Sequence, residues 1–167
     1  SALFIAAIPG RQVRAADLPV DVELVLAVDV SRSMDASERA IQRQGYRDAL
    51  RHPDVIRAIQ SGLTGRIALS YFEWSGPGSE HVTVPWTLVA DEASAGAFAA
   101  AIAPSRASGR FGTSISSSLL FAASLFVDNG FDGARQVIDV SGDGPNNVGG
   151  PVEPARDAVI SRGIVIN

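Results

Sequence analysis

One stretch decides the fold of this chain: Val22-Glu23-Leu24-Val25-Leu26-Ala27-Val28, followed directly by Asp29-Val30-Ser31-Arg32-Ser33. An apolar run this rich in valine and leucine is typical of a strand buried on both faces, as in parallel sheets. Side chains alternate along an extended chain, so Asp29, Ser31 and Ser33 point the same way and their oxygens can converge. One carboxylate and two hydroxyls suit a small divalent cation such as Mg2+. The alternative is a strand that ends in a polar, helix-capping loop.

The composition indicates a single globular domain and excludes several classes of function. The chain has 167 residues, of which 46% are hydrophobic and 19% charged, and its mean hydropathy is +0.16. That length is sufficient to bury a sizeable core. A net charge of -4 without any basic cluster argues against binding to nucleic acid or to anionic lipid. The absence of cysteine excludes disulfides, a thiolate nucleophile and a zinc ribbon.

The N-terminus resembles the end of a secretory signal. Residues 2–8 are apolar, and Pro9-Gly10 breaks the run. The segment Val13-Arg14-Ala15-Ala16 follows, with small residues at the position of a cleavage site before Asp17. The run is too short to span a bilayer. We therefore expect residues 1–16 to be a signal-peptide remnant and residues 17–167 to form the domain, in a periplasmic or secreted protein. The alternative is that residues 2–8 form an ordinary structural strand.

Beyond the opening strand, helical and extended patterns alternate. Residues 65–74 and 81–86 predict two strands joined by a short turn, which must be antiparallel, and Pro85 marks the second as an edge strand. Further strands are predicted at 136–141 and 164–166, and helices at 35–50, 54–59, 91–102, 115–127 and 151–162. This order predicts an α/β fold: a doubly wound, mostly parallel open sheet with one antiparallel edge strand and helices on both faces.

In such sheets, ligands bind beyond the carboxyl ends of the strands. Asp29 follows one buried strand and Asp143 follows another, so both carboxylates should lie at this edge. Gly112-Thr113 precedes a predicted helix.

The order Asp-x-Ser-x-Ser at 29–33, Gly-Thr at 112–113 and Asp-Gly at 143–144 resembles the von Willebrand factor A (integrin I-like) domain with its metal-ion-dependent adhesion site. Within that superfamily the chain is most similar to a bacterial group of uncharacterised, exported proteins. These carry the same Val-Asp-Val-Ser-Arg-Ser-Met-Asp and Ser-Gly-Asp-Gly-Pro-Asn-Asn strings, found here at 28–35 and 141–147. The resemblance extends over residues 22–167.

The resemblance implies a set of metal ligands. Ser31 and Ser33 would coordinate the ion through their hydroxyls, and Thr113 would reach it directly in one state and through water in another. Asp29 and Asp143 would bind the ion directly or through ordered waters. Mg2+ is the expected ion, with Mn2+ and Ca2+ as alternatives. An ion held mainly by hydroxyls and water keeps much of its charge. It can then accept an Asp or Glu of a protein partner, and no catalysis is expected.

Two departures from the family pattern affect this expectation. Arg32 stands where many relatives have glycine and adds a cation that can steer an acidic ligand. Arg106 and Arg110, before Thr113, would complete a partner-binding rim, or else belong to a solvated loop. The family also usually continues beyond Asn167 with one more strand and helix, and residues 2–8 are a candidate to cover the sheet edge left open.

Other interpretations remain open at this level. Thr113 could cap the following helix, and Asp143-Gly144 could form an ordinary turn that binds no ligand. A metal-dependent hydrolase of the aspartyl-phosphatase kind would use Asp29 as nucleophile. However, such a site needs a second carboxylate at position 31, where this chain has Ser31. It also needs a nearby lysine, and the chain contains none. A metal-free structural scaffold is the third alternative. His52, His81, Trp74 and Trp86 are expected to be structural, and Asp35 to cap a helix.

Overall fold

The computed structural model describes residues 16–32, 34–103 and 111–167. Residues 2–8, Ser33, Arg106 and Arg110 lie outside the described part of the chain, so the expectations for them stay predictions. The five-stranded sheet has the order β4-β3-β2-β6-β7. Its strands are β2 (Val22–Asp29), β3 (Ile67–Trp74), β4 (His81–Val89), β6 (Gln136–Ser141) and β7 (Val165–Ile166). All neighbours are parallel except β3 and β4.

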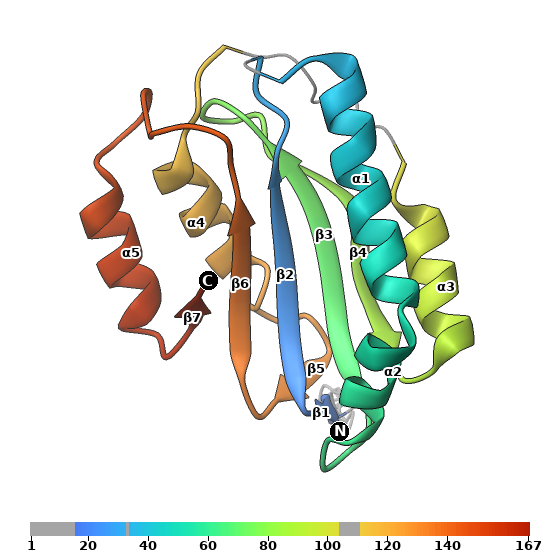
Figure 1. The fold of residues 1–167 in the computed structure, drawn as a ribbon. Coiled ribbons are helices and arrows are strands. Elements are labelled where there is room, and N and C mark those ends of the chain that lie inside the picture. The colour runs from blue at the N-terminus through green and yellow to red at the C-terminus, as the bar shows by residue number, and fades with distance from the viewer. Residues whose placement is uncertain (1–15, 33, 104–110) are drawn as a thin grey trace, which may run out of the picture.

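The five helices of the described residues lie on both faces of the sheet (Figure 1). They are α1 (Ala36–Arg51), α2 (Pro53–Gln60), α3 (Glu92–Ala101), α4 (Ile115–Ser124) and α5 (Val152–Ile160). Leu26 and Val28 of β2 pack in one hydrophobic cluster with α1, α2 and α3. Val25 and Ala27 face the other way and pack in a second cluster with α4 and α5. The expected doubly wound fold with a central strand buried on both faces is confirmed.

The antiparallel edge strand is confirmed, and it is longer than expected. β4 runs from His81 to Val89 and passes Pro85 by means of a bulge. Leu69 pairs with Thr87 and Tyr71 with Val84, so two residues of β4 face the single residue Ser70. Because β4 lies at the edge of the sheet, the missing N–H of Pro85 disrupts no pairing with a further strand.

A second, two-stranded sheet was not expected from the sequence. β1 (Leu18–Val20) pairs in parallel with β5 (Phe131–Gly133) beneath the N-terminal end of β2. Each strand is three residues long, and one contains proline and the other glycine. Such segments have no strand pattern of their own, and only their pairing makes them extended.

Helix ends follow the local capping chemistry. Asp35 caps α1, because its Oδ1 accepts hydrogen bonds from the N–H groups of Ser37 and Glu38 at 2.7 and 2.9 Å. These bonds, with that of the Ser37 hydroxyl, lower the pKa of Asp35. His52 caps α2, and Ser114, one residue after Thr113, caps α4. α4 ends at Ser124, before the end of the helical pattern at Val127.

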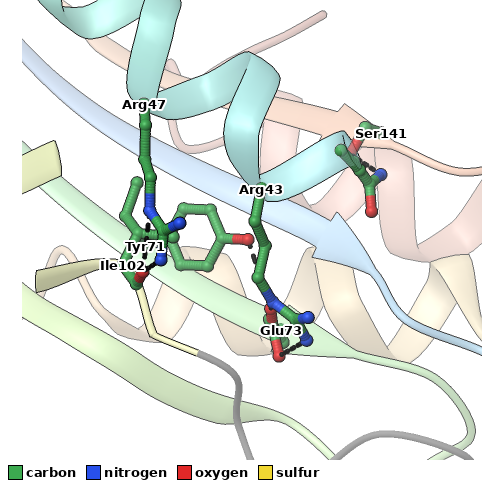
Figure 2. Close-up of polar contacts among 7 residues, drawn as sticks. Arg43, Arg47, Tyr71, Glu73, Ile102 and Ser141 are labelled. Atoms are coloured by element: carbon green, nitrogen blue, oxygen red, sulfur yellow. Dashed lines mark hydrogen bonds and ion pairs between the residues drawn. The ribbon is translucent and has the colours of Figure 1, made fainter. Parts of the chain in front are cut away.

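Buried polar contacts anchor α1 to the sheet and to α3 (Figure 2). Arg43 of α1 donates from Nε and Nη2 to the two carboxylate oxygens of Glu73, at 2.5 and 3.0 Å. The Tyr71 hydroxyl donates to the same carboxylate at 3.3 Å, and burial raises the pKa of this phenol. Arg47 donates to the carbonyl oxygen of Ile102. These contacts fix α1, the first helix after β2, against the sheet.

We predict that Arg43→Ala destabilises the protein by about 3–5 kcal/mol, because it leaves the fully buried Glu73 carboxylate without its cation. The matched control is Arg57→Ala, which breaks an ion pair with Asp54 whose side chains are 70% and 66% exposed. The control should cost about 0–1 kcal/mol. Urea unfolding measures both, and similar small losses in the two variants would contradict the assignment of Arg43–Glu73 as an anchor.

Candidate metal centre

The loops that follow β2, β3 and β6 meet at the carboxyl end of the sheet, at the top of Figure 1. Asp29 is the last residue of β2 and pairs with Trp74, the last residue of β3. The N–H of Val30 donates to the Trp74 carbonyl at 2.8 Å and extends this pairing by one residue. On the other edge, Val28 pairs with Ser141, the last residue of β6. The ends of three neighbouring strands therefore surround Asp29.

The Asp29 carboxylate is fully buried and only partly satisfied. Its Oδ1 accepts a hydrogen bond from the Ser31 N–H at 2.7 Å, whereas Oδ2 is buried without a hydrogen-bond partner in the described part of the chain. Burial raises the pKa of Asp29, against the opposing hydrogen bonds from Ser31. The negative charge of Asp143 raises this pKa further, although the backbone of Asp143 acts in the opposite direction. The ionised form is thus disfavoured by its surroundings, and a cation beside Oδ2 would stabilise it.

Three of the expected ligands, Ser31, Thr113 and Asp143, lie on the loops at this end of the sheet. Ser31 and Thr113 are buried, with 2% and 4% of their surfaces exposed. Asp143 lies on the exposed loop after β6, close enough for its charge to act on Asp29. A Cβ atom at Gly142 would lie 3.4 Å from Oδ2 of Asp29, so this loop passes directly against the buried carboxylate.

Hydrogen bonds between loops hold Thr113 in place. The Thr113 N–H donates to Oδ1 of Asn147 at 2.8 Å, and the Asn147 N–H donates back to the Thr113 carbonyl at 3.0 Å. The Ser114 N–H donates to the Ser75 carbonyl at 2.9 Å. The loop before α4 is therefore fixed between the loop after β3 and the loop after β6.

Close packing of backbone strengthens this contact between loops. A Cβ atom at Gly76 would lie 2.5 Å from the carbonyl oxygen of Phe111. Gly112 has a φ of +90°, which favours glycine, and its α-carbon packs against Val148. Glycine at these two positions allows the loops to approach one another this closely.

The residues present fit a hard divalent cation. No cluster of three or more His, Cys, Asp and Glu side chains that could hold a metal occurs within residues 16–32, 34–103 and 111–167. The donors that gather here are two carboxylates and hydroxyl groups, which suits Mg2+ better than a softer ion. A buried polar atom normally has a hydrogen-bond partner, but the buried Oδ2 of Asp29 has none among the described residues. A cation bound to this oxygen would supply that partner.

The rim of the site contains Arg32, which the sequence predicts there, and two residues that the sequence did not indicate, Phe111 and Val148. Arg32 is exposed, and its Cζ lies 4.5 Å from the centre of the Phe111 ring. Phe111 is 77% exposed and Val148 is 37% exposed. Asn147 orients Thr113 from the neighbouring loop. The sequence offered one signal for Phe111 as a rim residue, because it is an aromatic residue directly before Gly112-Thr113. Nothing in the sequence indicated that Val148 packs against this segment.

A family model described as "Protein of unknown function (DUF1194)" matches residues 19–167. The chain belongs to this DUF1194 family. Among curated proteins, none matches the sequence. None of the helices in the described part of the DUF1194 chain has the length and apolar character needed to cross a membrane.

Solved structures show that this DUF1194 chain has the von Willebrand factor A fold. Proximal thread matrix protein 1 of the mussel byssus, solved with a zinc-occupied MIDAS motif, is 15% identical with a TM-score of 0.64, over 91% of this chain and 38% of its own. The von Willebrand factor type A protein of Catenulispora acidiphila is 20% identical with a TM-score of 0.59, over 88% and 32%. BatB of Bacteroides thetaiotaomicron is 22% identical with a TM-score of 0.54, over 87% and 64%. This chain thus spans less than two thirds of each of these proteins.

We predict that Gly76→Ala destabilises the protein by about 1–3 kcal/mol, because the new methyl group would collide with the Phe111 carbonyl and force the loops apart. Gly144→Ala is the matched control: it also precedes a proline, and nothing lies within 4 Å of its Cβ position. Thermal unfolding should separate the two variants. Equal stabilities would show that the loops do not pack as described.

Proposed function

We propose that this chain is a protein-binding module that depends on a divalent metal ion. Asp29, Ser31, Ser33, Thr113 and Asp143 would hold the ion, with Mg2+ expected and Mn2+ or Ca2+ as alternatives. When bound, the ion would offer a coordination position to an Asp or Glu side chain of a partner protein. The observation that carries the proposal is the buried Oδ2 atom of Asp29, which has no hydrogen-bond partner among the described residues.

The surroundings of Asp29 favour binding over catalysis. Ser31 occupies the position at which an aspartyl-phosphatase-like hydrolase would need its second carboxylate, and the sequence contains no lysine. Hydroxyl ligands also neutralise little of the charge of an ion, so the ion retains a strong attraction for a partner's carboxylate. A metal-free scaffold is a weaker alternative, because it would leave the burial of Asp29 uncompensated.

We also propose that the domain, residues 17–167, functions in the periplasm or as a secreted protein, with residues 1–16 as a signal remnant. The apolar residues 2–8 and the small residues that follow support this location. One of the similar structures is a matrix protein of the mussel byssus, which is consistent with a binding role outside the cell.

The primary test is thermal unfolding in EDTA and then with Mg2+, Mn2+ or Ca2+. At about 100 times its dissociation constant the ion should stabilise the chain by about 2.7 kcal/mol, a shift of about 5–10 °C. Asp29→Asn should remove the shift, because it eliminates the buried charge that the cation would neutralise. Asp132→Asn, an exposed carboxylate on β5, should keep it. A shift that survives in Asp29→Asn would refute the site, and its absence from the wild type would refute the proposed function.

The role of Thr113 has a separate test. Thr113→Val keeps the shape of this buried side chain but removes its hydroxyl, whereas Thr113→Ser keeps the hydroxyl. We expect Thr113→Val to weaken metal affinity at least about tenfold, and Thr113→Ser to stay close to wild type. Calorimetric titration with Mg2+ and Mn2+ measures this difference. Equal affinities for Thr113→Val and wild type would remove Thr113 from the ligand set.

A further inference from the structure

We infer that the partner presents a bulky apolar side chain next to its acidic residue, and that the surface formed by Arg32, Phe111 and Val148 receives it. We call this surface the Phe111 rim. The inference rests on the proposed function, since the acidic residue would bind the metal ion while its neighbour contacts the rim. It adds a requirement on the partner that the ion alone does not impose.

The position of Phe111 is the first observation behind this inference. Eight large hydrophobic residues of the described chain are exposed, and Phe111 is the only aromatic among them. It lies two residues before Thr113, and the residue is 77% exposed. Val148 is also exposed, and it packs against Gly112, which is the residue between Phe111 and Thr113 in the sequence. The two exposed apolar residues therefore gather beside the candidate metal centre.

The rim is also held in place before any partner binds. The Phe111 carbonyl packs against Gly76, and Thr113 exchanges two hydrogen bonds with Asn147. Arg32, which lies between Ser31 and Ser33, stacks on the Phe111 ring with a Cζ-to-centroid distance of 4.5 Å. Side chains that are ordered in the free protein lose little conformational entropy on binding. Aromatic and arginine residues with this order are typical of the energetically dominant positions of interfaces.

The chemistry of the rim defines the partner segment. Arg32 supplies a positive charge that attracts an acidic segment, and its stacked guanidinium covers one side of the ring. The remaining ring surface and Val148 are apolar, so a contact with Phe, Leu, Ile, Met or Trp removes apolar surface from water on both sides. We therefore expect a linear segment in which Asp or Glu lies within about three residues of such a side chain, the reach of an extended chain over neighbouring loops.

The test is selection from a displayed library of random twelve-residue peptides. The full chain is immobilised in Mg2+, and bound peptides are eluted with EDTA. Wild type should enrich peptides with an acidic residue beside a bulky apolar one. Phe111→Ser should still enrich acidic residues but lose the preference for an apolar neighbour.

A synthesised peptide from the wild-type selection then measures affinity. We expect Phe111→Ser to weaken its binding roughly 10- to 100-fold, with Phe111→Leu retaining most of the affinity. The matched control, Val127→Ser, also removes an exposed apolar side chain, 61% exposed and beyond the far end of α4, and should change affinity less than about twofold. The thermal shift with metal should be the same in all three variants and the wild type.

The outcomes separate this inference from the proposed function. If the wild type shows the metal-induced shift but enriches no peptides, or acidic peptides without an apolar neighbour, the inference is overturned and the metal site stands. The same holds if Phe111→Ser and Val127→Ser bind the selected peptide equally well. If the wild type shows no metal-induced shift, the proposed function fails and this inference fails with it.

Discussion

The pairing of β2 along both of its edges places the other parts of the sheet and the loops that follow them. β2 is hydrogen-bonded to β3 along its whole length and to β6 over six residues, and its side chains are covered on both faces. Because the three strands are parallel and in register, they end at the same level. The loops after them are thus brought together at Asp29. The candidate site is a direct consequence of this topology, as is general for open α/β sheets.

Three buried carboxylates in this protein differ in how their burial is compensated. Glu73 is paired with Arg43, and Glu23 accepts hydrogen bonds from the backbone of Gly133 and the side chain of Asn129. Asp29 has one oxygen without a partner in the described part of the chain. Burial of a charge is costly unless it is paired. This contrast singles out Asp29 as the buried carboxylate with an oxygen that the described residues leave unsatisfied.

The fold alone does not determine what the site binds. The compared von Willebrand factor A structures share at most 22% of their residues with this chain and include a matrix protein and BatB. A shared fold at this distance leaves function to the residues of the site. Here those residues are a buried, incompletely satisfied carboxylate, hydroxyl groups beside it, and an arginine stacked on an exposed aromatic ring.

Local sequence patterns were enough to predict the doubly wound sheet, the antiparallel edge strand and the positions of Asp29 and Asp143 at strand ends. These features follow from local patterns: apolar runs define buried strands, and polar residues after them mark the edge where ligands bind. The three-dimensional arrangement of the elements was needed to reveal the β1–β5 pairing, the buried Arg43–Glu73 ion pair, the link between Asn147 and Thr113, and the stacking of Arg32 on Phe111. Each of these joins residues distant in the sequence. No local periodicity encodes such contacts, because they depend on which loops and helices the strand order places side by side.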